Sequence, residues 1–325
     1  MSPDRTALER LATLPRLTLA AVPTPVEDLA RLRHALGGGP TLLVKRDDAM
    51  AFGFGGNKIR KLQVVVAQAL ADGADTLITT GGVQSNHARA TAAVAARMGL
   101  GCVLVVSGAP QAKPTANALL DRLLGADVRY VESGDRRAPG MEEAAAELRA
   151  KGRRPFVIPL GASTPLGAAA YAMAVTELLT QIAPPDVILL STSSGGTQAG
   201  IIAGCRLHGL STRVLGISAD DPSGTIATGI ARILRGLEAL IGTPPGTLAD
   251  APIEIDDGFV GPGYGMPTEA STEAIEICAR REALFLDPTY TAKAMAGLIA
   301  KVRAGGVGTG TALFWHTGGQ VGLFV

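Results

Sequence analysis

The feature that most constrains the fold of this chain is a recurring unit: a short apolar segment, a glycine-rich turn and an amphipathic helix. The segment TLITT (76–80) shows the pattern, because GGVQSNH and then ARATAAVAARMG follow it. Continuous apolar strands that alternate with helices are typical of parallel sheets covered on both faces. We therefore predict an α/β protein with open, mainly parallel sheets and helices on both faces. The expected strands are 76–80, 102–108, 127–132, 155–161, 187–192, 213–219 and 311–316.

The same unit starts again after residue 160, which indicates two domains. A chain of 325 residues suits one large domain or two modest ones. We predict a small domain over residues 51–160. The large, cofactor-binding domain is then formed by residues 1–50 together with residues 161–325. No long linker separates the two.

Charge and composition exclude several classes of function. A net charge of +1 gives no electrostatic case for binding nucleic acid or an anionic membrane, and no apolar run is long enough to span a bilayer. The N-terminal segment has acidic residues and no apolar core, which argues against a secretory signal. Cys102, Cys205 and Cys278 lie far apart, and the four histidines show no ligand spacing. We expect free thiols in the cytoplasm, and neither disulfides nor a metal site.

The stretch GFGGNKIRK (53–61) places three cations in the first turn of an expected helix, at the positive end of the helix dipole. A solvated position is the commonest fate of such a lysine. However, burial at a glycine-lined helix start, close to other cations, lowers the pKa of an amine. The neutral amine forms Schiff bases, so Lys58 is a candidate nucleophile. We interpret Asn57 as the helix cap, and Arg60 and Lys61 as solvated or pKa-lowering neighbours.

The loop SSGGTQAG (193–200) follows the apolar segment VILLST and opens a helix. Glycines let the backbone approach an anion, and the free N–H groups of a helix start bind phosphate. Ser193, Ser194 and Thr197 add hydroxyl donors, although a plain turn of small residues is the alternative. Neither a Gly-Lys-Ser/Thr core nor a GxGxxG pattern is present, which disfavours a Walker A loop and NAD. A Schiff-base lysine with a separate phosphate loop indicates pyridoxal phosphate (PLP) as cofactor.

A second polar loop, GGVQSNH (81–87), follows the expected strand 76–80. Ser85 or Asn86 is a natural N-cap for the next helix, and capping alone would explain one such residue. Four successive polar residues, from Gln84 to His87, exceed what a cap requires. We predict that this helix start binds a substrate carboxylate. A hydroxyl there can also take part in catalysis if a base is near.

Two further segments place aromatic or small polar residues in turns. The chain has only four tyrosines, and Tyr264 and Tyr290 both lie in segments with turn residues. Turn packing is the simpler explanation, and contact with a flat ligand is the other. The stretch WHTGG (315–319) follows an apolar strand, so that Thr317 and the two glycines allow a close approach to a ring edge.

In this order, the motifs KRDDAMAFGFGGNKIRKL, GGVQSNHARATAA, SSGGTQAG, LDPTYTAKAMAGL and FWHTGG resemble those of the fold-type II PLP enzymes. More narrowly, the chain is similar to the family of D-cysteine desulfhydrases and 1-aminocyclopropane-1-carboxylate (ACC) deaminases, from about Leu17 to the C-terminus. The combination of GGNKxRKL with QSNH is the specific part of this resemblance. It implies a fold like that of the tryptophan synthase β subunit and, as is common in fold type II, a homodimer.

The resemblance also implies a role for each matching residue. Lys58 would bind the cofactor covalently and transfer the α-proton of the substrate, assisted by Ser85 and by Tyr264 or Tyr290. The implied cofactor-binding residues are Lys58, Asn86, Ser194, Gly195, Gly196, Thr197, Tyr290, Thr291 and Thr317. The implied substrate-binding residues are Gln84, Ser85, Asn86, His87 and Tyr264.

Position 291 separates two activities within this family. ACC deaminases resemble LDPVYEGK, with a Glu that contacts the pyridine nitrogen, whereas this chain has LDPTYTAK, with Thr291. A carboxylate deepens the electron sink, and opening a cyclopropane ring needs this more than expelling sulfide does. We therefore predict β-elimination on D-cysteine, giving pyruvate, ammonia and hydrogen sulfide. The alternatives are an L-cysteate sulfo-lyase, an ACC deaminase, and a PLP-binding protein without turnover. The chain departs from the family pattern at Gln63, at Thr289 and in the segment 50–52. These departures leave undecided which group is expelled from the β-carbon.

Overall fold

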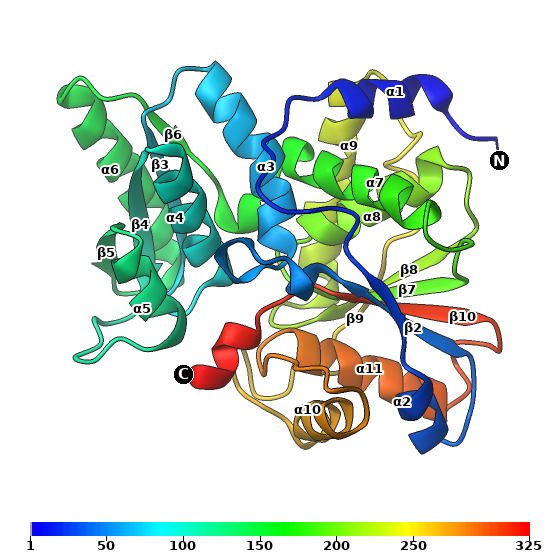
Figure 1. The fold of residues 1–325 in the computed structure, drawn as a ribbon. Helices are drawn as coiled ribbons and strands as arrows, with labels where there is room; N and C mark the ends of the chain where they lie inside the picture. Colours follow the sequence, from blue (N-terminus) through cyan, green and yellow to red (C-terminus); the bar gives the residue numbers. More distant parts are fainter. Residues whose placement is uncertain (1) are drawn as a thin grey trace.

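The computed structural model describes residues 2–325, which form two lobes, each built on one sheet (Figure 1). All neighbouring strands run parallel except the first pair of the larger sheet, which is antiparallel. In spatial order, the larger sheet contains β1 (Val26–Asp28), β2 (Thr41–Arg46), β10 (Thr311–His316), β7 (Val187–Thr192), β8 (Arg213–Ser218) and β9 (Glu254–Asp256). The smaller sheet contains β5 (Asp127–Val131), β4 (Gly101–Ser107), β3 (Thr76–Gly82) and β6 (Pro155–Val157).

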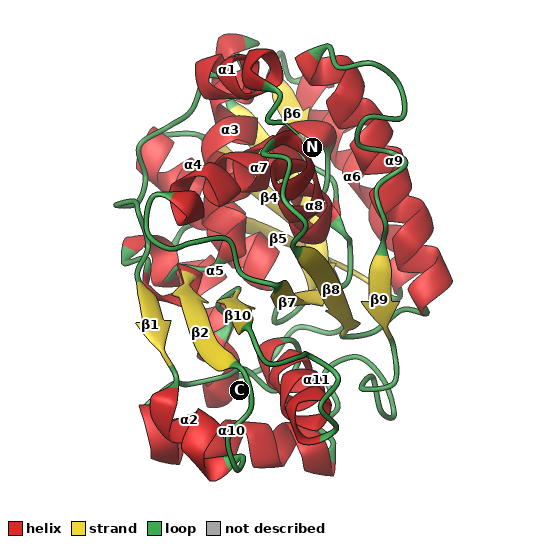
Figure 2. Cartoon of the chain, turned by 90° about the vertical axis from the view of Figure 1, so that its right-hand side faces the viewer, coloured by secondary structure: helices red, strands yellow, loops and turns green. Residues whose placement is uncertain are grey.

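Helices cover both faces of both sheets, which confirms the predicted α/β class (Figure 2). Over one face of the larger sheet lie α1 (Arg5–Thr13), α7 (Pro165–Leu179), α8 (Gly196–Leu207) and α9 (Ser223–Ile241), and over the other lie α2 (Ala30–Ala35), α10 (Glu269–Glu282) and α11 (Thr291–Arg303). The smaller sheet has α3 (Asn57–Ala71), α4 (Asn86–Met98) and α5 (Ala116–Leu123) on one face and α6 (Arg137–Ala150) on the other.

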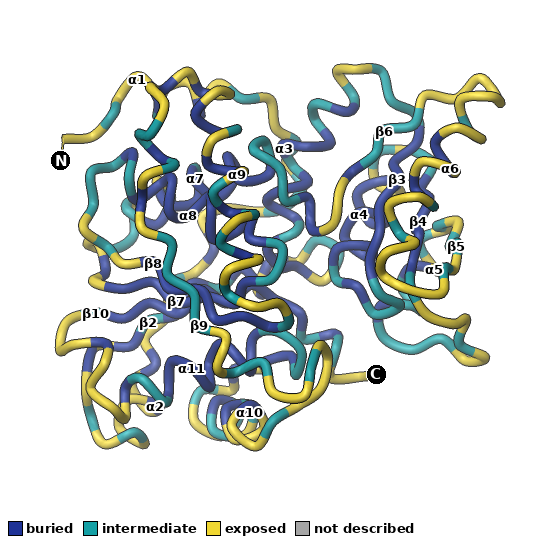
Figure 3. The backbone as a smooth tube through the Cα atoms, turned by 180° about the vertical axis from the view of Figure 1, so that it is seen from behind, coloured by how far each residue is buried: buried dark blue, intermediate teal, exposed yellow. Residues whose placement is uncertain are grey.

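The strands are continuously apolar because each of their faces meets a separate layer of helices. In β7, Ile188 and Leu190 pack with α7 and α8, whereas Val187 and Leu189 pack with α11. Successive side chains of a strand point to opposite faces, so an apolar residue is required at every position. The central strands are accordingly buried, while α1, α6 and α10 expose long stretches (Figure 3).

The structure also contains elements that the sequence pattern did not predict. The strands β1, β2 and β9 and the helices α1, α2 and α11 are additional, and β6 ends at Val157, earlier than expected. The short strands β1 and β9 lie at the two edges of the larger sheet, where few residues carry the apolar signal. The division into residues 51–160 and the remainder stays a prediction.

A buried cluster of charges joins four elements of the two lobes. The carboxylate of Asp47, just after β2, accepts hydrogen bonds from Arg60 of α3, Tyr171 of α7 and Trp315 of β10. Arg60 also pairs with Glu177 of α7 at 2.7 Å. Burial alone raises the pKa of Asp47, but the Arg60 charge and these hydrogen bonds outweigh it and hold the pKa below its usual value.

Within residues 2–325, no helix has the length and apolar character needed to cross a bilayer. Cys102, Cys205 and Cys278 are free and buried, as the sequence predicted, and burial raises the pKa of each thiol to about 12. The same part of the chain brings together no group of three or more His, Cys, Asp or Glu side chains that would hold a metal ion.

Candidate active site

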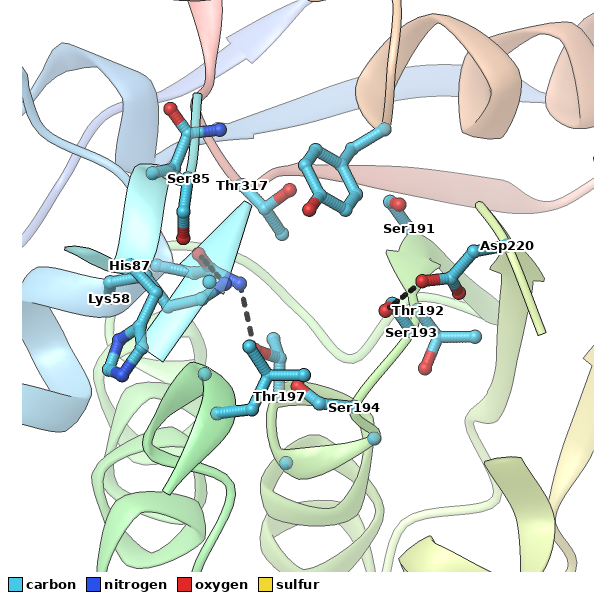
Figure 4. Close-up of a pocket in the computed structure, with 18 of the residues that line it drawn as sticks. Lys58, Ser85, His87, Ser191, Thr192, Ser193, Ser194, Thr197, Asp220 and Thr317 are labelled. Atoms are coloured by element: carbon cyan, nitrogen blue, oxygen red, sulfur yellow. Dashed lines mark hydrogen bonds between the residues drawn. The ribbon is translucent and has the colours of Figure 1, made fainter. Parts of the chain in front are cut away.

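A cavity of about 390 Å³ is lined by residues of both lobes. It lies at the carboxyl ends of β3, β7, β8 and β10, where open parallel sheets bind ligands. In Figure 4, Lys58, Ser85 and His87 lie on one side, and Ser193 and Asp220 lie opposite. The predicted site residues that line the cavity are Lys58, Ser85, Asn86, His87, Ser194, Gly195, Gly196, Thr197, Tyr264, Tyr290 and Thr317.

Lys58 lies in the first turn of α3, and its Nζ donates a hydrogen bond to Asn57 Oδ1 at 2.8 Å. Burial, and then the charge of Arg89, lower the pKa of the amine to about 8. At pH 7 on the order of a tenth of Lys58 is therefore neutral and nucleophilic, against well under a thousandth for an ordinary lysine with a pKa of about 10.4. The amine faces a cavity, which is the arrangement that a carbonyl ligand needs.

The neighbours of Lys58 differ from the sequence-based interpretation. Gly56, with φ of 94°, is the N-cap of α3, and Asn57 instead donates to Thr197 Oγ1 at 2.9 Å. Arg60 and Lys61 are buried, not solvated. Arg60 joins the Asp47 cluster, and Lys61 donates to the Gly161 carbonyl at 3.1 Å. The sequence pattern of cations cannot distinguish these fates, because burial depends on which elements pack against α3.

The start of α8 forms a cradle for an anion. Gly195, with φ of 77°, precedes the helix and has no side chain to cap its first N–H groups. The N–H of Gly196 donates to Ser163 Oγ at 3.3 Å, and a Cβ atom on Gly196 would lie 2.6 Å from that oxygen, so only glycine lets Ser163 approach the helix start this closely. Ser194 and Ser163 share a hydrogen bond of 2.8 Å beside it. Free N–H groups and hydroxyls at a helix N-terminus bind phosphate.

The loop after β3 carries the second group of predicted residues. Ser85 is the N-cap of α4, with Oγ accepting from Ala88 N at 3.2 Å, and it lines the cavity as well. Asn86 and His87 follow in the first turn. Burial, and then the charges of nearby lysines, lower the pKa of His87 well below its usual value, so its ring is neutral. The start of α4 therefore offers N–H groups and neutral polar side chains to an anion.

Two predicted residues are not on the cavity wall. The side chain of Gln84 turns toward α5, where it accepts from Asn117 N at 2.9 Å and donates to Thr115 O at 3.2 Å. Thr291 is buried at the start of α11. Its Oγ1 donates to Asp287 Oδ1 at 2.7 Å and accepts from Asp287 N at 2.8 Å, so its only donor is used within the segment.

The two tyrosines meet at the cavity. The hydroxyls of Tyr264 and Tyr290 lie 2.6 Å apart, and the rings pack edge to face. Tyr264 is 48% exposed, whereas burial raises the pKa of Tyr290 well above its usual value. Thr317 follows β10, and its carbonyl accepts from Asn57 N at 2.9 Å, which ties the Lys58 helix to the larger sheet.

Several residues of the cavity wall were not predicted from the sequence. Ser191 and Thr192 end β7, so the rule that ligands bind beyond strand ends gave a usable signal for them. Arg137 and Asp220 lie in segments without a motif. The unpredicted residues of the wall include Lys61, Arg137, Ser191, Thr192, Asp220 and Asp221.

The residues present fit PLP. The cofactor needs a neutral amine for its aldehyde and a separate site for its phosphate, and Lys58 and the start of α8 line the same cavity. Furthermore, the buried hydroxyls of Ser191 and Thr192 line this cavity without a hydrogen-bond partner in residues 2–325, which leaves them available to a bound polar group.

Comparisons with known proteins agree with this chemistry. The model of the family described as "Pyridoxal-phosphate dependent enzyme" matches residues 17–318. The chain is 37% identical over 327 residues to a D-cysteine desulfhydrase of Klebsiella pneumoniae, with 98% of each chain covered. It is 40% identical over 329 residues to an ACC deaminase of Burkholderia multivorans, with 96% of each covered.

A solved structure described as an ACC deaminase homologue superimposes with a TM-score of 0.91 at 34% identity, covering 100% of this chain and 97% of that one. The family model spans the site from Lys58 to Thr317. The chain therefore belongs to the pyridoxal-phosphate dependent enzymes of fold type II, and its cofactor is pyridoxal 5'-phosphate.

Proposed function

We propose that this enzyme is a lyase that acts on D-cysteine by β-elimination, which releases hydrogen sulfide, and that water then hydrolyses the remaining enamine to pyruvate and ammonia. Relatives named D-cysteine desulfhydrase and ACC deaminase have similar identity to the chain, at 37% and 40%. Overall similarity therefore does not choose between the two activities, and the choice depends on single positions near the cofactor.

The observation that carries the choice is the hydroxyl at position 291. The carboxylate nearest to it, that of Asp287, accepts hydrogen bonds from the N–H groups of Thr289, Tyr290 and Thr291 and from the Thr291 hydroxyl. Asp287 thus caps α11 and does not line the cavity. This segment supplies no free carboxylate to deepen the electron sink, which favours expulsion of a good leaving group such as sulfide over opening of a cyclopropane ring.

Each group of side chains has a role in the proposed reaction. When bound, the cofactor supplies the electron sink for the substrate's α-carbon. The Lys58 amine, with its pKa of about 8, takes the α-proton, and the hydroxyls of Ser85, Tyr264 and Tyr290 assist proton transfer. The start of α4, from Ser85 to His87, binds the substrate carboxylate, with Gln84 supporting it from behind.

The remaining predicted residues hold the cofactor in this proposal. Ser194, Gly195, Gly196 and Thr197 receive the phosphate at the start of α8. Asn86 donates to the ring hydroxyl, and Thr317 approaches the ring edge. Tyr290 faces the ring. Thr291 does not reach the cavity, and it acts indirectly by donating to Asp287, which also accepts from the backbone N–H of Tyr290.

A substrate panel tests the proposal. Pyruvate release from D-cysteine, L-cysteate, β-chloro-D-alanine and ACC is measured under the same conditions. We expect turnover of D-cysteine and β-chloro-D-alanine, because both carry a leaving group on the β-carbon. Turnover of ACC alone would overturn the interpretation of Thr291, and turnover of L-cysteate alone would identify a sulfo-lyase.

The Lys58→Ala variant separates catalysis from binding. We expect it to lose the yellow colour of the holoenzyme, which absorbs at about 410–420 nm, and also to lose the release of pyruvate. A wild-type protein that is yellow but releases no pyruvate from any of these amino acids would be a PLP-binding protein without turnover. A colourless protein that stays colourless with added PLP would contradict the cofactor assignment.

We propose in addition that the enzyme is a cytoplasmic homodimer. Three free, buried cysteines suit a reducing compartment. The resemblance to fold-type II enzymes, many of which are dimers, favours two copies. Light scattering of the purified holoenzyme measures the mass, and a value near 33.1 kDa, that of one chain, would contradict the dimer.

A further inference from the structure

A line of hydrogen-bonded side chains runs from Arg89, through Asn117 of α5, to Asn86 on the cavity wall. We propose that Arg89 and Asn117 are positioning residues that fix which side of the Asn86 amide faces the cofactor. The two atoms of a side-chain amide differ in function, since the oxygen only accepts and the nitrogen only donates hydrogen bonds. An Asn that contacts a ligand therefore needs its orientation to be set by its other neighbours.

The orientation begins at Arg89, which is 1% exposed. Its guanidinium donates to the carbonyls of Gly53 and Gly55, in the loop that leads to Lys58, and its Nε donates to Asn117 Oδ1 at 3.3 Å. Arginine has five donors and no acceptor. The oxygen of the Asn117 amide must therefore face Arg89.

A second contact fixes Asn117 independently. Its Nδ2 donates to the backbone carbonyl of Gln84 at 2.9 Å, and a carbonyl can only accept. The other hydrogen of Nδ2 is directed to Asn86 Oδ1, also at 2.9 Å. Turning the Asn117 amide over would place donor against donor at Arg89 and acceptor against acceptor at Gln84. Asn117 is 1% exposed, so water cannot relieve such contacts.

Asn86 then has a single orientation. Its oxygen is held by Asn117, so its nitrogen lies on the other side of the amide group, beside Gly319. A Cβ atom added to Gly319 would lie only 3.2 Å from this nitrogen. Gly318 and Thr317, the residues just before, line the cavity. Asn86 therefore presents a donor to the cavity, which suits the ring hydroxyl oxygen of PLP, an acceptor when it is deprotonated.

Gln84 completes the arrangement. Its Oε1 accepts from the backbone N–H of Asn117, which holds the first turn of α5 against the loop before α4. The side chain of Gln84 thus contributes to the site by locating Asn117. This inference rests on the proposed contact between Asn86 and the cofactor.

A double-mutant cycle tests the positioning role. The variants are Asn86→Ala, Asn117→Leu and their combination, and Thr91→Val is the matched control, since it removes a buried hydrogen bond within α4 but none of this line. Two quantities are measured: the dissociation constant of PLP from the apoenzyme, and the pH midpoint of the visible absorption band of the holoenzyme. Circular dichroism establishes that each variant is folded.

We expect Asn86→Ala and Asn117→Leu each to weaken PLP binding about 10- to 100-fold, the range for a hydrogen bond to a charged group. Each should also raise the pH midpoint, because the ring oxygen loses a donor. The double variant should bind PLP as tightly as Asn86→Ala alone. The positioning role would be overturned if Asn117→Leu weakened PLP binding equally in the wild type and in Asn86→Ala, or if it left the pH midpoint unchanged.

Asn117→Asp keeps the test decisive if Asn117→Leu does not fold. The aspartate has nearly the same shape but no donor for Asn86 Oδ1, so Asn86 must turn its nitrogen away from the cavity. The same rise of the midpoint is expected, and its absence contradicts the proposal. If Asn86→Ala leaves PLP binding unchanged, the cofactor contact and the positioning role both fail, whereas pyruvate release from D-cysteine still decides the proposed reaction.

Discussion

At the scale of single residues, the amine of Lys58 combines a lowered pKa with a place on the cavity wall. Burial and the Arg89 charge lower its pKa to about 8. In the apoenzyme we therefore expect the modification of Lys58 by trinitrobenzenesulfonate to reach half its maximal rate near pH 8. The labelled peptide is followed by mass spectrometry, and Lys58→Ala should lack this phase. If Lys58 were labelled only at about pH 10.4, as an ordinary lysine is, the lowered pKa would be contradicted.

The sequence predicted at this scale the residues whose chemistry can be read from one motif. Lys58, Ser85 and the loop 193–197 were found because a cation at a helix start, or a glycine-rich turn after a strand, is itself unusual. The burial of Arg60 and Lys61 was not predictable, since it follows from packing against α7 and the loop at residue 161. The positions of Gln84 and Thr291 likewise depend on partners, Asn117 and Asp287, that no local pattern marks.

At the scale of elements, the start of α8 depends on its glycines. Gly196→Ala would bring a Cβ atom within 2.6 Å of Ser163 Oγ and 2.8 Å of Ser163 Cα, so the start of α8, where we propose that the phosphate binds, would have to shift. We expect the variant to fold but to bind PLP at least about tenfold more weakly, because hydrogen bonds to a charged phosphate are lost. Equilibrium dialysis of the apoenzyme measures this.

Gly224→Ala is the matched control for that substitution. Gly224 lies in the first turn of another helix, α9, and a Cβ atom there meets nothing within 4 Å. Its PLP affinity should equal that of the wild type. Equal affinities for both variants would show that the start of α8 does not hold the phosphate.

The buried Asp47 cluster ties β2, α3, α7 and β10 together. We expect Asp47→Asn to lower the free energy of unfolding by about 3–5 kcal/mol, because Arg60 keeps only Glu177 as a carboxylate partner. The folded pKa of Asp47 lies below its unfolded value. The stabilisation is therefore complete above the unfolded pKa of about 3.9 and is lost as the pH falls through the folded pKa. Urea denaturation at neutral and acidic pH measures both effects.

Asp127→Asn provides the comparison for this prediction. Asp127 pairs with Arg129, but its side chain is 55% exposed. Its substitution should cost less than about 1 kcal/mol, as is usual for surface ion pairs. If the two substitutions lowered the free energy of unfolding by similar amounts, burial would not strengthen the interactions of the Asp47 cluster.

Elements with a strong apolar signal were predictable, and the others were not. The strands β7 and β8 and the helix α4 were predicted correctly because apolar residues and end signals agree there. The strand β2 was missed because it contains Lys45, whose charge is met in the structure by Glu177 at 2.6 Å. A partner 132 residues away leaves no trace in the local pattern.

At the scale of the whole molecule, the cavity draws its wall from both lobes, so bound PLP should stabilise them together. A ligand at 100 times its dissociation constant contributes about 2.7 kcal/mol to the folded state. We expect the holoenzyme to unfold in one transition at a higher Tm than the apoenzyme, as followed by calorimetry. In Lys58→Ala the same PLP concentration should raise the Tm less. If PLP shifted only one of two separate transitions, the lobes would be binding independently.

The strand β10 has a consequence for how the protein is made. It lies between β2 and β7, although it is translated after every other strand of residues 2–325. While a ribosome still holds residues 311–316, the nascent chain presents two unpaired strand edges and lacks Thr317, which anchors the start of the Lys58 helix. We therefore expect a chain truncated before residue 311 to aggregate through the exposed edges of β2 and β7 rather than to fold into a weak enzyme.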